Sequence, residues 1–124
     1  MDVKSMSEKD FQRIVVDAAK LNGWAVYHIS DSRKSANGKM VGDKMAAGLP
    51  DLILIHGSRG FVFAELKRES GRIRPKQREC LEAMAAASTL TAGKVRVALW
   101  RPSDMDDYIM PILSQGKGPT TYGF

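Results

Sequence analysis

The sequence GLPDLILIHGSRGFVFAELKRESG, from Gly48 to Gly71, contains the clearest structural pattern in the chain. Two apolar and β-branched runs, DLILI and FVFAELK, flank the turn residues 56–60, and this pattern predicts a β-hairpin. Side chains alternate between the two faces of a strand, so Glu65 and Lys67 are expected on one face, about 6.6 Å apart. The hairpin therefore carries an acid and a base side by side near its end.

The register of this hairpin places a second acid beside the first. If Ile55 lies opposite Phe61, counting back along the strands puts Asp51 across from Glu65. Two facing carboxylates, with Cβ atoms about 5 Å apart, repel each other and cost stability. A hard divalent cation such as Mg²⁺ reverses that cost, because carboxylate oxygens are its preferred ligands. The pattern thus predicts a metal site with Lys67 nearby.

A simpler interpretation of the same residues stays open at this point. Glu65 and Lys67 would form an exposed ion pair worth under about 1 kcal/mol, and Asp51 would only begin a strand.

Length and composition favour one soluble domain over residues 1–124, with flexible ends at 1–6 and about 115–124. No apolar run approaches the roughly 18 residues that span a bilayer, and the first residues are polar, so neither a membrane segment nor an export signal is expected. One Cys and two His nearly exclude a Cys/His zinc site and exclude an internal disulfide. We therefore expect a cytoplasmic protein.

Hydrophobic periodicity outlines the remaining elements. Apolar residues recur at helical spacing behind Ser7 and predict a helix to about Leu21. The other predicted elements are strands at 24–30 and 94–100, and a helix that opens at Pro75. A last helix is expected at 103–113, with Ser103 as its cap and Pro111 as a residue that could end it early. The order is α-β-β-β-α-β, which indicates an α/β fold with a mixed four-stranded sheet flanked by helices. The polar segment 31–48 is longer than ordinary connections, which predicts a functional or poorly ordered loop.

The net charge of +5 is concentrated after the hairpin. Residues 67–78 hold six basic side chains and one acid, Glu69. Such a segment suits a phosphate-rich partner, although a solvated helix face would have the same composition.

The motifs PD at Pro50-Asp51 and ELK at 65–67 resemble the PD-(D/E)xK nuclease pattern. Together with SEKDFQRIVVDAAKLNGW, GLPDLIL, FVFAELKRESGRIRPKQREC and VRVALWRP, they resemble the virus-type replication-repair nuclease (VRR-NUC) domain, from Glu8 to about Pro102. The resemblance implies a restriction-endonuclease-like core.

The resemblance also implies roles for individual residues. Asp51, Glu65 and the backbone carbonyl of Leu66 would hold the metal, and Lys67 would be catalytic. Glu8 would reach the metal, through water, and Gln77 would line the site. From the residues alone, Glu8 lies one turn before Phe11 and is expected on the buried side of its helix, an unusual place for an acid with nothing to bind. It equally fits a favourable charge at a helix start, and Gln77 fits a capping hydrogen bond.

The implied activity is that of an endodeoxyribonuclease that uses one or two Mg²⁺ or Mn²⁺ ions and no small-molecule cofactor. It would hydrolyse phosphodiester bonds in branched DNA such as Holliday junctions, during replication, recombination or repair, as a homodimer in a bacterial or phage-infected cell. The side chains expected to grip the DNA backbone are Arg33, Lys34, Lys39, Lys44, Arg68, Arg72, Arg74 and Lys76.

Three alternatives are compatible with the same sequence: a flap or duplex nickase, a non-catalytic DNA-binding module of this fold, and a purely structural interaction domain. His28 and His56 are weaker catalytic candidates, and Cys80 is expected to be a core residue.

Overall fold

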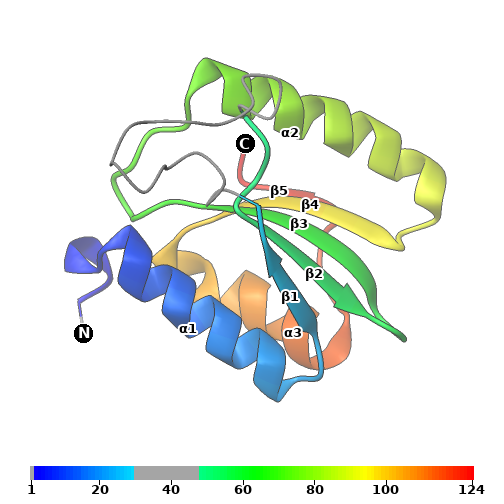
Figure 1. Ribbon diagram of the computed structural model, residues 1–124, viewed down its shortest axis with the longest axis horizontal. Helices are drawn as coiled ribbons and strands as arrows, with labels where there is room; N and C mark the ends of the chain where they lie inside the picture. The colour runs from blue at the N-terminus through cyan, green and yellow to red at the C-terminus, as the bar shows by residue number, and fades with distance from the viewer. Residues whose placement is uncertain (1, 30–47) are drawn as a thin grey trace, which may run out of the picture.

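The computed structural model describes residues 2–29 and 48–124, which form a mixed five-stranded sheet with helices on both faces (Figure 1). The strands lie in the order of the chain: β1 (Ala25–His28), β2 (Leu52–His56), β3 (Gly60–Leu66), β4 (Val95–Trp100) and β5 (Thr121–Tyr122). β1, β2 and β3 are antiparallel neighbours, whereas β3, β4 and β5 run parallel. The α/β class and the mixed sheet are confirmed. The segment 30–47, on which part of the predicted long loop falls, lies outside the described residues.

Three α-helices accompany the sheet: α1 (Glu8–Leu21), α2 (Pro75–Ser88) and α3 (Met110–Gln115). Short turns of 3-10 helix lie at Val3–Ser5 (η1), Thr89–Thr91 (η4) and Pro102–Asp104 (η5), and a π-helical segment lies at Met105–Ile109 (η6). Ser7 caps α1 as predicted, because its hydroxyl oxygen accepts a hydrogen bond from the Asp10 N–H at 3.0 Å. No helix in the described part of the chain is long and apolar enough to cross a membrane.

The last predicted helix lies at the predicted residues, but it is not one continuous α-helix. Instead of one helix, the chain forms η5, η6 and α3 in succession. The turn begins with the Asp104 carboxylate, which accepts from the Arg101 N–H at 2.8 Å, so Ser103 is not the cap. Pro111 lies in the first turn of α3, where proline is tolerated, and does not end the helix.

The prediction of a four-stranded sheet was one strand short. β5 lies inside the carboxyl-terminal segment that we expected to be flexible, and η1 lies inside the amino-terminal one. β5 pairs with β4, and the Val97 N–H donates to the Thr120 carbonyl at 2.8 Å. The Tyr122 hydroxyl also donates to the Asp104 carboxylate at 2.7 Å. A two-residue strand held by such distant contacts leaves no periodicity in the sequence.

The sheet separates two cores. α1 and α3 pack on one face, over a core that includes Phe11, Leu54, Val62 and Trp100, and α2 packs on the other, over Leu81, Val97 and Leu99 (Figure 1). Along β3, Val62, Ala64 and Leu66 belong to the first core, as the alternation predicted. Glu65 therefore faces the α2 side. Since β3 is covered on both faces near its end, the Glu65 carboxyl group there is removed from water.

Candidate functional site

The strand register brings the two predicted acids together. Ile55 pairs with Phe61, as expected, and the β2–β3 ladder ends at the pair Leu52–Ala64. The next residues outward are Asp51 and Glu65. The Asp51 carboxylate accepts a hydrogen bond from the Leu66 N–H at 2.9 Å, and the Asp51 carbonyl accepts from the Ile29 N–H at 2.9 Å. These two bonds fix Asp51 at the end of β3.

Glu65 is the least ordinary residue of this cluster. It is only 1% exposed, and neither carboxylate oxygen has a hydrogen-bond partner among the described residues. Burial, the neighbouring Asp51 carboxyl and the charge of Glu8 together raise its pKa to about 9, against the opposing charge of Lys67. Without a cation, Glu65 is therefore protonated at neutral pH. A buried acid with no partner destabilises the fold, and a bound cation would offset that cost.

Lys67 and Glu8 lie at the same cluster. Lys67 is half-buried, and its backbone N–H donates to the Trp100 carbonyl at 3.0 Å, which extends the β3–β4 pairing by one residue. Partial burial raises the pKa of the Glu8 carboxyl, while the charge of Lys67 lowers it and that of Asp51 raises it. The pKa of Glu8, the first residue of α1, therefore depends on the charges of both Asp51 and Lys67.

One expectation about Glu8 was wrong. We expected it on the buried side of its helix, but the residue is exposed. The buried stripe of α1 starts only at Phe11, so the first turn extends beyond the core. Glu8 reaches the cluster from the solvent side.

Gln77 lies in the first turn of α2 and already has a structural task. Its side-chain oxygen accepts from the Arg74 N–H at 2.9 Å, the capping bond that the sequence alone had also allowed. Gly48 packs against this helix start, since a Cβ there would lie 2.5 Å from the Lys76 carbonyl oxygen. A role for Gln77 in the reaction stays a prediction.

Cys80, which we expected to be a core residue, is not part of either core and lies on the α2 side of the cluster. Burial raises the pKa of the Cys80 thiol, and the charges of Glu65 and Glu79 raise it further. Cys80 is half-buried, and its thiol contacts the Met84 sulfur at 3.9 Å. Neither of these sulfur groups hydrogen-bonds to the Glu65 carboxyl, whose oxygens stay without a partner in the described structure.

The basic segment between β3 and α2 is held in place by an arginine that we did not single out. The Arg101 guanidinium Nη1 donates to the carbonyl oxygens of Arg68, Glu69 and Gly71 at 2.9, 3.1 and 2.7 Å. The Ser103 N–H donates to the Glu69 carboxylate at 3.1 Å. The only signal in the sequence was a basic residue directly after a buried strand.

This anchoring presents an exposed set of cations next to the acids: Arg68, Arg72, Arg74 and Lys76. The other four predicted DNA contacts, Arg33, Lys34, Lys39 and Lys44, lie outside the described residues.

The donor set at the end of the hairpin fits a hard divalent cation. Within residues 2–29 and 48–124, no group of three or more His, Cys, Asp or Glu side chains is arranged to hold a metal. Mg²⁺ does not need such a cage, because one or two carboxylates with waters and substrate oxygens suffice. The two unpartnered oxygens of Glu65, beside the Asp51 carboxylate, supply that arrangement.

Comparison with known proteins agrees with this geometry. The model of the VRR-NUC domain matches residues 4–100, which include β1 to β4, both acids and Lys67. Comparisons with curated proteins and with solved structures gave no significant match. The family match covers most of the chain, so this protein belongs to the VRR-NUC domain family and is a nuclease domain.

Proposed function

We propose that the protein is a metal-dependent DNA endonuclease whose reaction centre is the Asp51–Glu65–Lys67 cluster. The observation that carries the proposal is the buried Glu65 carboxyl, whose oxygens lack partners in the described structure. Burial raises its pKa far above the ordinary value, and such perturbed acids are typical of functional sites. A structural ion pair would have left Glu65 exposed beside Lys67.

Each residue of the cluster has a defined task in this proposal. Asp51, Glu65 and the Leu66 carbonyl would hold one or two Mg²⁺ or Mn²⁺ ions. When bound, the metal lowers the pKa of a water and offsets charge on the phosphate. Lys67 orients the attacking water and donates to the phosphoryl oxygen as negative charge develops there. Glu8 accepts a proton or a hydrogen bond from that water on the solvent side.

The substrate is DNA, gripped through its phosphates by the exposed cations after β3. Arg101 ties the backbone of this basic segment to the end of β4. The basic side chains of the segment would therefore face the substrate from a fixed position. Contacts to phosphates position a duplex without reading its bases. We therefore propose selection by DNA shape, with branched junctions as the preferred class.

A homodimer would present two such centres to the two strands of a junction. β1 has no neighbour on its outer side among the described strands, and Tyr27 on β1 is 56% exposed. Exposed edge strands favour pairing with another chain, which supports the proposal of a dimer.

The test is a cleavage assay on four-way junction, flap and linear duplex DNA, with titrations of Mg²⁺ and Mn²⁺. The wild type is compared with Glu65→Gln and Lys67→Met, and Glu82→Gln on the exposed face of α2 is the matched control. We expect loss of cleavage in the first two variants and wild-type rates in the control. DNA binding that survives EDTA, without nicking under any metal condition, would instead identify a non-catalytic binding module.

A further inference from the structure

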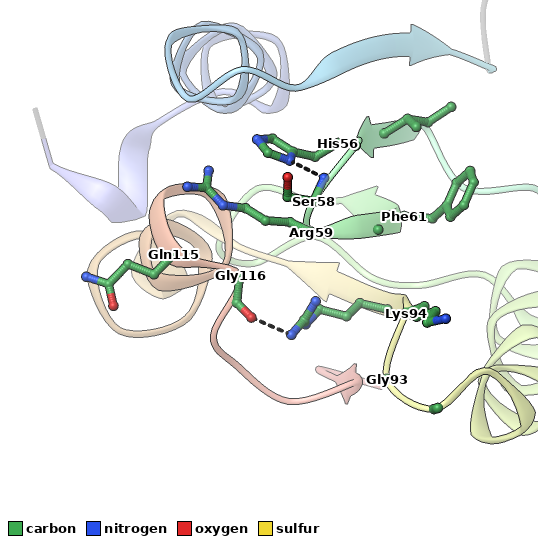
Figure 2. A pocket seen from close by; sticks show the side chains of 13 residues that line it. His56, Ser58, Arg59, Phe61, Gly93, Lys94, Gln115 and Gly116 are labelled. Carbon is green, nitrogen blue, oxygen red and sulfur yellow. Dashed lines mark hydrogen bonds between the residues drawn. The ribbon is translucent and has the colours of Figure 1, made fainter.

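A second polar region lies at the opposite end of the sheet from the acid cluster. A pocket of about 610 Å³ is formed by the β2–β3 turn, the start of β4 and the end of α3 (Figure 2). Glu65 lies five residue steps along β3 from Gly60, which at about 3.3 Å per step amounts to about 17 Å. The two regions are therefore separate sites.

The charged residues that line this pocket all have the same sign. Arg59 lies in the hairpin turn, Lys94 precedes β4, and Arg96 lies on β4. Among the described residues, no acid lines the pocket and none of these three cations has an ion-pair partner. Like charges around one cavity repel each other, so an anion in the cavity would stabilise the arrangement.

Arg96 is the residue that a purely structural explanation does not account for. It is 8% exposed, and its Nη2 donates to the Gly116 carbonyl at 2.8 Å, the lower dashed line in Figure 2. Its Nε is buried and has no hydrogen-bond partner in the described structure. Burial also lowers the pKa of the guanidinium. Arginine is rarely buried without a partner for its charge, and here a single carbonyl is the only acceptor that the described structure supplies.

Three acceptors around the pocket are already used by the protein itself. The Leu113 carbonyl accepts from Trp24 Nε1 at 2.9 Å and from Arg59 Nη1 at 2.8 Å. The Lys94 carbonyl accepts from the Phe61 N–H at 2.9 Å. His56 Nδ1 accepts from the Ser58 N–H at 3.0 Å, the upper dashed line in Figure 2. The pocket is left with an excess of positive hydrogen-bond donors.

We propose that this pocket binds a phosphate group, either free or carried by a nucleotide. Guanidinium groups pair with phosphate through parallel hydrogen bonds, and lysine adds a point charge. The volume lies within the range of about 300–1,000 Å³ found for small-molecule sites, which leaves room for a sugar and a base.

Amide NMR spectra of the full ¹⁵N-labelled chain test this proposal, in phosphate-free buffer with EDTA so that no metal occupies the acid cluster. The probes are inorganic phosphate, deoxyadenosine 5′-monophosphate and deoxyadenosine. We expect saturable shifts at the amides of Ser58, Lys94 and Gly116 with the two phosphate compounds and not with the nucleoside. Equal affinity for phosphate and nucleotide would identify the free ion as the ligand, and tighter nucleotide binding would identify the nucleotide.

Two variants separate the pocket from general electrostatics. Lys94→Gln, at an exposed residue that does not threaten folding, is expected to weaken binding about tenfold by removing one charged donor. Lys20→Gln removes an exposed cation at the end of α1 that does not line the pocket, and it is expected to bind like the wild type. The proposal is overturned if the pocket amides do not shift, if both variants weaken binding equally, or if shifts occur only near Lys67.

Discussion

Replacement of Glu65 by glutamine should change how the metal-free protein responds to pH. The folded-state pKa of Glu65 is about 9, against an ordinary value of 4.5. Below pH 4.5 the carboxyl is protonated in both the folded and the unfolded chain, so it causes no penalty. Above that pH the unfolded chain ionises while the folded chain keeps its proton. The free energy of unfolding must therefore fall as pH rises, until the folded carboxyl also ionises near pH 9.

The size of the effect follows from the width of this window. Each pH unit between the two pKa values costs about 1.36 kcal/mol, so pH 7 lies about 2.5 units into the window and the loss is about 3 kcal/mol as an upper bound. Glutamine cannot ionise, so Glu65→Gln should remove this contribution. The comparison should use the slope of the unfolding free energy against pH rather than its absolute value, because the glutamine amide also changes the hydrogen bonds beside Asp51.

The assay is urea unfolding in EDTA at pH 5, 7 and 8.5, repeated with excess Mg²⁺. The wild type should lose stability as pH rises in EDTA and recover it with Mg²⁺, because a ligand that binds only the folded chain stabilises it. Glu65→Gln should show neither effect, and the exposed control Glu82→Gln should behave like the wild type. If the wild-type free energy of unfolding in EDTA does not change with pH, or falls equally steeply in Glu65→Gln, then Glu65 is not the group that causes the pH dependence.

Three further outcomes follow from the same structure. Lys67→Met should reduce cleavage about 10²–10³-fold, as loss of a donor to developing charge does, while Mn²⁺ binding measured by calorimetry stays unchanged. Arg101→Ala should weaken junction binding in gel shifts, because three carbonyl anchors of the basic segment are lost, and Lys20→Ala is the control that should bind normally. Gly48→Ala should destabilise the fold by about 1–3 kcal/mol in urea unfolding, since φ is +96° and a Cβ would lie 2.5 Å from the Lys76 carbonyl; unchanged stability would contradict that packing.

The hairpin was predictable because local rules determine it. Alternation and loop length were enough to place Ile55 opposite Phe61, and this pairing brings Asp51 to the end of β3 next to Glu65. The cap at Ser7 and the start of α2 at Pro75 also follow from local chemistry. The burial of Glu65 was not predictable, because it depends on α2 covering that face of the sheet.

The features that the sequence did not reveal depend on distant contacts. β5 exists because two residues of the tail pair with β4, and Arg101 matters because its side chain reaches carbonyl oxygens 30 to 33 residues earlier in the chain. Arg96 has the alternating pattern of an ordinary strand residue, and only the folded structure shows that its side chain is buried and bonded to the Gly116 carbonyl. Residue type and spacing do not indicate which distant residues will become such partners.

The most direct test of the account is a crystal soaked with Mn²⁺ and measured at the manganese absorption edge. We predict an anomalous peak within bonding distance of carboxylate oxygens of both Asp51 and Glu65. An enzyme that cleaves DNA in the presence of Mn²⁺ while its crystals show no anomalous peak beside Glu65 would contradict the claim that a divalent cation compensates this buried acid.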